Sequence, residues 1–229
     1  MAKINKTDAA IGKTPQQTVG PYVTLGLLNK FSNRDELNND LTEKGGSGEK
    51  IIIEGNIMAS DNYPMFNVMV EIWQANSKGV FNHSIDHDNP DYDPSFVGFG
   101  RAITNRMGHF EFKTFKPGPT KHSNHFEDSE APHIMMIIHS RGVAHPLATR
   151  IYFEDENTVD DYSKTLTDQE HQGIIAKKVG SAGMNRYHID IVLDGTGKEL
   201  LNEPLITDQQ AKDLKEEIHR PVTHLFVID

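Results

Sequence analysis

The chain of 229 residues contains no cysteine. Neither a disulfide framework nor a thiolate metal site can form, so any metal ion has to be held by His, Tyr, Asp or Glu side chains. Long apolar runs are absent as well: the first 20 residues hold no apolar block of signal-peptide length, and no later window approaches the length of a membrane span. These absences predict a soluble, cytoplasmic protein.

Basic residues are fewer than acidic ones. There are 33 acidic and 23 basic residues, which gives a formal net charge of −10 at pH 7. Because such a chain repels phosphate backbones and anionic lipid, we expect neither nucleic acid nor a membrane as a partner. The sequence also lacks a G-x-S-x-G nucleophile elbow, a Gly-rich phosphate loop before a helix and a basic stripe.

What the sequence does contain is a strong strand signal in residues 131–141, APHIMMIIHSR. Its Ile and Met residues are typical of a buried strand. His133 stands at the head of the run and Arg141 at its tail, and because half-buried polar groups need partners, both are candidates for a functional site. Purely structural roles are the alternative: His133 can bind a backbone carbonyl, and Arg141 can form a structural ion pair.

Seven further short runs have the composition or alternation of strands. They cover residues 51–59, 67–75, 96–104, 109–115, 147–153, 187–193 and 222–228. Many short strands separated by turns, with only peripheral helices, predict an all-β fold: a β-sandwich of mostly antiparallel strands with a few helices outside it.

Two capping boxes predict the helices. Thr167 begins the first, which we expect to run on through Ile174, Ile175 and Lys177, and Thr207 begins the second. We expect one domain overall, in which residues 1–49 form an N-terminal arm and a polar helix or loop segment and residues 50–229 form the sandwich. Within the arm, residues 14–22 carry two prolines, which suit either a segment laid across another surface or a turn into the first strand.

Histidine is abundant, with 12 copies in the chain. Several are close in sequence, namely His83 with His87, His122 with His125, and the group His133, His139 and His145. The His83–His87 pair stands beside Asp-Asn-Pro, so it belongs to a loop rather than a helix. Loop histidines in an acidic protein are mostly solvated, and metal binding by them is the minor alternative.

The order of motifs resembles the intradiol ring-cleaving dioxygenases. The matching stretches are QTVGPY, IEGNIM, VEIWQANSKGVFNH, DPSFVGFGRAIT, FKPG, APHI, SRG, TRIYF and RYHIDI. The resemblance implies a β-sandwich and the use of a non-haem Fe(III) held by two tyrosines and two histidines, with the ferric ion activating a chelated catechol for attack by dioxygen.

On the family pattern the four ligand positions fall on Phe81, Thr120, His133 and Met135, which we call the degenerate positions. Phenylalanine has no phenolate oxygen, and the Met135 thioether is a weak ligand for a hard ferric ion. A single His133 does not hold iron in this geometry. We therefore expect this chain to bind no catalytic iron.

The resemblance also implies a partner. Members of the family that convert 3,4-dihydroxybenzoate to 3-carboxy-cis,cis-muconate pair an iron-bearing β subunit with an α subunit that has lost its ligands. Likeness to the α type implies that Fe(III) is held by a β subunit and that small aromatic acid and O2 meet at the interface. The implied substrate-binding residues are Thr18, Gly20, Pro21, Tyr22 and Arg141, with Arg141 facing the substrate carboxylate; no catalytic residue is implied in this chain.

Two departures from the α-type pattern keep alternatives open. Residues 197–221 form an insertion of unassigned role, and FNHSIDHDNPDYDPSF is closer to the β type. A divergent subunit acting on another catechol is one alternative. A non-enzymatic sandwich module that assembles with itself is another, and a self-sufficient enzyme that holds another metal with its loop histidines is a third.

Overall fold

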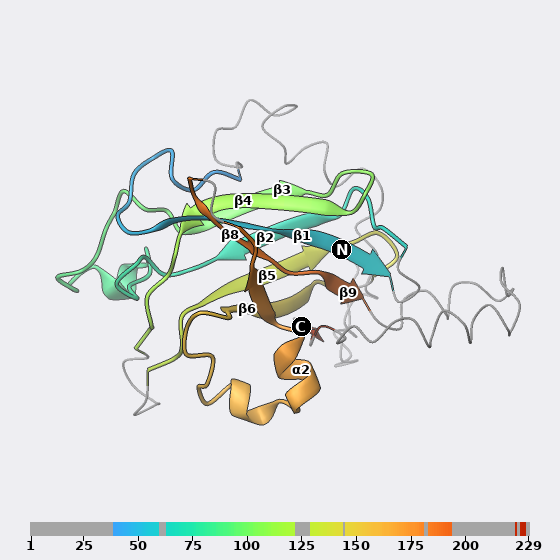
Figure 1. Cartoon of the computed structure of the whole chain (residues 1–229). Helices are drawn as coiled ribbons and strands as arrows, with labels where there is room; N and C mark the ends of the chain where they lie inside the picture. The colour runs from blue at the N-terminus through green and yellow to red at the C-terminus, as the bar shows by residue number, and fades with distance from the viewer. Residues whose placement is uncertain are drawn as a thin grey trace, which may run out of the picture.

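The computed structural model describes residues 39–59, 63–121, 129–143, 145–180, 183–193, 223 and 225–227. Within them the chain forms a 10-stranded curled sheet, whose two halves enclose one core (Figure 1). The strands are β1 (Lys50–Ala59), β2 (Met69–Trp73), β3 (Phe99–Ile103), β4 (His109–Phe115), β5 (His133–His139), β6 (Leu147–Phe153), β7 (Ile175–Lys178), β8 (Asn185–His188), β9 (Ile191–Leu193) and β10 (Phe226–Val227). The described helices are η1 (Ser84–Asp86), η2 (Ser163–Thr165) and α2 (Asp168–Gln172).

The predicted all-β, mostly antiparallel sandwich is confirmed. The strand order is β3-β2-β5-β6-β7-β8-β1-β4, with β9 beside β1 and β10 beside β6. Strands β3, β2, β5 and β6 pair antiparallel in that order. β7 then pairs parallel with β6 and antiparallel with β8, which leads to the other half of the sheet. Strand β5, which corresponds to the strand signal of residues 131–141, therefore lies in the interior of the sheet, between β2 and β6.

Alternation along the strands builds the core. On β5 the side chains of Ile134, Met136 and Ile138 are fully buried, while the residues between them are half-buried. They pack in one cluster with Phe110 and Phe112 of β4 in the other half of the sheet. Burial of each such side chain stabilises the fold by about 2 kcal/mol, so the register of β5 is strongly specified.

One helix prediction is wrong in its length. The capping box exists, because the Thr167 hydroxyl accepts from the Glu170 N–H and the Glu170 carboxylate accepts from the Thr167 N–H. The helix α2 nevertheless ends at Gln172, with Gly173 as its C-cap, and Ile175 begins strand β7. The reason is tertiary: Ile174 and Ile175 are buried, and their backbone pairs with β6, which outweighs the local helical signal.

The predicted strand over 187–193 is two strands. β8 and β9 both run parallel to β1, but the chain bends between them, where the Ile189 N–H donates to the Glu54 carbonyl. Gly55 makes the bend possible, because a Cβ on it would lie 1.7 Å from the Ile189 carbonyl oxygen.

Several predictions lie wholly or partly outside the described residues. These include residues 1–38 of the predicted N-terminal segment 1–49, the helix that begins at Thr207 and most of the last strand, of which Phe226–Val227 pairs with β6. Residues 39–41 run beside β4, where the Leu41 N–H donates to the Lys113 carbonyl and the Leu41 side chain joins the core. The division at residue 49 stays a prediction. None of the helices in the described ranges is long and apolar enough to cross a membrane.

Candidate functional site

The fold brings the four degenerate positions together at one end of the sandwich. Trp73 on β2 pairs across the sheet with Met135 on β5, and the Phe81 ring stacks on Trp73 with centroids 5.9 Å apart. Thr120 pairs through its backbone with Glu130, three residues before His133. Segments that are distant in the sequence therefore converge here.

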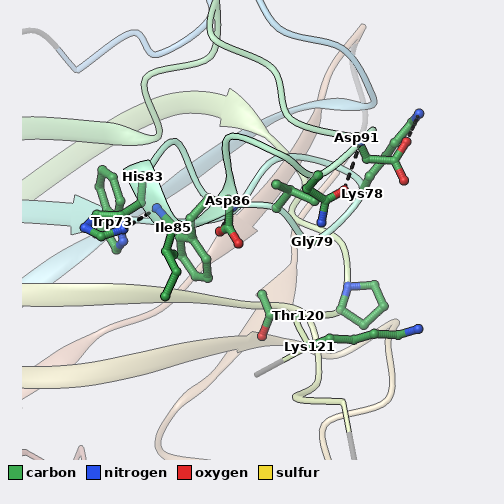
Figure 2. Close-up of a pocket in the computed structure, with 13 residues that line it drawn as sticks. Trp73, Lys78, Gly79, His83, Ile85, Asp86, Asp91, Thr120 and Lys121 are labelled. Carbon is green, nitrogen blue, oxygen red and sulfur yellow. Dashed lines mark hydrogen bonds and ion pairs between the residues drawn. The ribbon is translucent and has the colours of Figure 1, made fainter. Parts of the chain in front are cut away.

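Phe81 and Thr120 also line a common cavity of about 510 Å³. Figure 2 shows Trp73, His83 and Ile85 on one side of this cavity and Thr120 with Lys121 on the other, while Lys78 and Asp91 form an ion pair at its edge. The size suits a small ligand.

The donor atoms at these positions do not fit a ferric ion. Phe81 offers none and Met135 offers a thioether. The Thr120 hydroxyl donates to Glu130 Oε2 at 3.2 Å, so it is engaged. His133 is 4% exposed, and its Nδ1 lies 2.8 Å from the Ala131 carbonyl, to which it donates; its Nε2 is then the one nitrogen donor left among the four positions. Among the described residues no three His, Asp or Glu side chains converge as metal ligands.

A half-buried ion network lies beside these positions. Arg150, the cross-strand neighbour of Met135, places Nη2 3.0 Å from Glu130 Oε1 and Nη1 3.9 Å from Asp160 Oδ2. Its guanidinium also lies over the Tyr162 ring, 4.4 Å from the centroid. Glu130 Oε2 lies 3.8 Å from His133 Nε2. Arg150 is therefore the shared ion-pair partner of two carboxylates, those of Glu130 and Asp160.

Hydrogen bonds anchor the second carboxylate. Asp160 accepts from the Tyr152 hydroxyl at 2.9 Å, from the Ala131 N–H at 3.2 Å and from the Ser163 N–H at 2.8 Å. Burial by itself would raise the pKa of Asp160, but these donors and Arg150 outweigh it, so the pKa is lowered. Burial and then the charge of Arg150 lower the pKa of His133, which favours the neutral ring at pH 7.

Arg141 lies at the opposite end of the sandwich. His139 at the C-terminal end of β5 pairs with Met69, and Met69 pairs with Ile103, so this end of β5 is level with the turn 104–108. In Figure 1 this turn lies at the end of the sandwich opposite the loop that holds η1. Arg141 is exposed, its guanidinium lies 4.5 Å from the centre of the Phe66 ring, and it forms no ion pair with any residue the structure describes. Thr18, Gly20, Pro21 and Tyr22 lie outside the described residues.

The histidines that the structure describes do not converge as a metal site. His133 and His139 occupy opposite ends of β5, and His139 Nε2 lies 3.0 Å from Glu71, which also binds Arg101. His83 and His87 are exposed. His122 and His125 lie outside the described residues.

Sequence reasoning missed Glu130, Arg150 and Asp160. Arg150 stands within the matched TRIYF motif, and Glu130 directly precedes the matched APHI motif. The sequence therefore shows that Glu130 and Arg150 each stand at or beside an apolar strand signal, but it does not show that they pair with each other.

Comparison with known proteins places the chain in a family. The dioxygenase family model matches residues 22–195. The chain belongs to the intradiol ring-cleaving dioxygenases, and it is an enzyme subunit of that class.

Among named relatives, it is 32% identical over 195 residues to the protocatechuate 3,4-dioxygenase alpha chain of Pseudomonas putida, a match that covers 81% of this chain and 94% of the relative. The beta chain of the same enzyme from Burkholderia cepacia is 34% identical over 122 residues, covering 51% of this chain and 52% of that one. Both chain types are thus related to this protein, and the fuller match is to an alpha chain.

The fold has solved counterparts. The dioxygenase domain of a dioxygenase carbohydrate-binding protein fusion from Streptomyces sp. SirexAA-E superposes with a TM-score of 0.51 at 20% identity, over 79% of this chain and 97% of that chain. At this identity the likeness concerns the fold alone, and it agrees with the sandwich described above.

Proposed function

We propose that this chain is the α-type, iron-free subunit of a protocatechuate 3,4-dioxygenase, active with an iron-bearing β subunit. In this assembly 3,4-dihydroxybenzoate is cleaved between its two hydroxylated carbons to 3-carboxy-cis,cis-muconate, with O2 as the oxidant. The ferric ion of the β subunit supplies the activation of the catechol. This chain supplies part of the pocket wall.

The observation that carries the proposal is the chemistry of the degenerate positions. Phe81 has no donor atom, the Thr120 hydroxyl is engaged by Glu130, and Met135 is a soft ligand, so His133 is left as a single nitrogen donor. A chain of this family with such side chains needs a partner to hold the metal. The existence of alpha and beta chains among the relatives supports a β subunit in that role.

Arg141 is the residue that we assign to the substrate. The chain is acidic, so an anionic substrate needs a local cation, and a guanidinium binds a carboxylate with two parallel hydrogen bonds. Arg141 is exposed and forms no ion pair within the described residues, which leaves its charge available to a ligand at an interface. We assign Thr18, Gly20, Pro21 and Tyr22 to the same pocket wall.

Co-expression tests the proposal. The chain is purified alone and together with a β-type homologue that carries both tyrosines and the H-x-H pair. We expect the chain alone to be colourless and inactive, and the pair to show the tyrosinate-to-iron charge-transfer band and to consume 3,4-dihydroxybenzoate and O2. The β homologue alone is the control. An isolated chain that is coloured and cleaves rings unaided would overturn the proposal, and a chain that never binds the β homologue would favour a non-enzymatic module.

A further inference from the structure

Three of the four degenerate positions lie beside charged side chains of the chain itself. Glu130 Oε2 accepts from the Thr120 hydroxyl at 3.2 Å and lies 3.8 Å from His133 Nε2. Its other oxygen lies 3.0 Å from Arg150 Nη2, and Arg150 pairs across the sheet with Met135. Three of the four degenerate positions therefore contact Glu130 or stand beside Arg150.

Arg150 connects separate parts of the fold. It stands on β6, Glu130 stands just before β5 and Asp160 stands in the loop that leads to η2. Glu130 also holds the segment of Thr120 through two backbone hydrogen bonds of 3.1 and 2.8 Å. One cation thus links elements that are far apart in the sequence, which is the mechanical task of a structural metal ion.

The surroundings require a positive charge. The side chains of Glu130, Asp160 and Arg150 are 14%, 2% and 16% exposed. Two poorly solvated carboxylates in one place are costly unless a cation compensates them. Arg150 supplies this charge, since its guanidinium lies 3.0 Å from Glu130 Oε1 and 3.9 Å from Asp160 Oδ2.

We propose that the Arg150 guanidinium is the resident cation of the degenerate metal position, where it links Glu130 and Asp160 in place of a metal ion and keeps metal ions out by its own charge. The inference rests on the proposed function in one respect, because the four degenerate positions are taken from the family pattern. It goes further by naming the group that took over the role of the metal.

Removal of Arg150 is the test. In the full-length Arg150→Ala variant the carboxylates of Glu130 and Asp160 and the imidazole of His133 are left without their cation. We expect the variant to bind Co²⁺ about 10-fold or more tightly than the wild type, because a fixed positive charge about 4 Å away no longer repels the ion. The measurements are the visible d–d absorption of bound Co²⁺ and the rise of Tm when Co²⁺ is added.

Arg101 is the matched control. It binds Glu71, the side chains are 14% and 13% exposed, and His139 contacts the same carboxylate at 3.0 Å. This cluster has an arginine, a glutamate and a histidine, and among the described residues no second carboxylate contacts it. We expect Arg101→Ala to lose stability without gaining Co²⁺ affinity. The double variant Glu130→Ala with Arg150→Ala is expected to lose the gain as well.

The possible outcomes all bear on the proposal. A Co²⁺ affinity of Arg150→Ala no greater than that of Arg101→Ala overturns it and leaves Arg150 as an ordinary ion pair. If Arg150→Ala does not fold, Arg150→Gln keeps most of the stem without the charge and is titrated in the same way. If neither variant folds, refolding in Co²⁺ is expected to recover folded protein, and failure to do so counts against the proposal.

These results are independent of catalysis. The proposed function fails if the co-expressed β homologue gains nothing from this chain, whatever the Co²⁺ titrations show. The present inference fails on the Co²⁺ affinity of the isolated chain, whatever the activity of the pair.

Discussion

Two arginines near the two ends of the sandwich differ in what their guanidinium groups face. Arg150 is 16% exposed and lies between Glu130 and Asp160. Arg141 is exposed and touches only the Phe66 ring among the charge and aromatic contacts of the described residues. The difference teaches that the same side chain stabilises the fold where its charge is compensated internally and is available to a ligand where it is not.

The largest expected effect is on stability. Arg150→Ala leaves two poorly solvated carboxylates without a cation, so we expect the free energy of unfolding to fall by about 3 kcal/mol. Arg141→Ala removes an exposed group, and we expect a change within about 0.5 kcal/mol. Urea unfolding of the two variants of the isolated chain measures both. Equal losses would remove the distinction between the two ends.

The second effect is on substrate affinity. In the complex with a β subunit, Arg141→Ala is expected to raise KM for 3,4-dihydroxybenzoate by roughly 30-fold, since a charge-assisted hydrogen bond contributes about 2 kcal/mol. Catechol lacks the carboxylate, so its KM should stay near the wild-type value. Steady-state kinetics with both substrates make the comparison, and an equal rise for both would contradict the role of Arg141.

The third effect depends on pH and concerns Asp155, just after β6. Burial by itself would raise its pKa, but hydrogen bonds from Lys116, Tyr187 and Lys178 outweigh it and lower the pKa from 3.8 to about 2. Because the folded pKa lies below the unfolded one, the stabilisation is present above pH ~4 and is lost as the pH falls toward ~2.

Asp155→Asn is expected to cost about 1 kcal/mol at neutral pH, a figure reduced for the partial exposure of the side chain. The difference from the wild type should shrink as the pH is lowered through the range given above. Urea unfolding at several pH values checks this, and a difference that does not change with pH would rule out titration of Asp155 as its cause.

The smallest effect concerns Phe66, whose ring contacts the Arg141 guanidinium. Phe66→Ala removes a cation–π contact whose centroid distance is 4.5 Å. At an exposed site such a contact contributes about 0.5 kcal/mol, so we expect KM for 3,4-dihydroxybenzoate to rise about 2-fold with kcat unchanged. A large fall in kcat would show that Phe66 does more than hold the guanidinium.

Much of the fold follows from local pattern. The strands over 109–115 and 147–153 match β4 and β6 to the residue. In β4 the apolar and polar side chains largely alternate, which specifies one buried face, whereas β6 ends in an apolar run, Ile151–Phe153, that is buried on both faces. The family resemblance likewise rests on short motifs that are readable in one dimension. Where a segment is held by distant backbone, the pattern misled: Ile174 and Ile175 continue a helical signal, yet pairing with β6 makes them part of a strand region.

The degenerate positions show the same division. From the residue types alone it follows that Phe81 and Met135 are poor ligands for a ferric ion, because donor chemistry belongs to the side chain itself. That Glu130 and Arg150 meet beside them depends on the pairing of β5 with β6, which brings together residues 20 positions apart. Local composition decides which groups are available, whereas burial and partnership are properties of the packed chain, since the energy of a charge depends on what surrounds it.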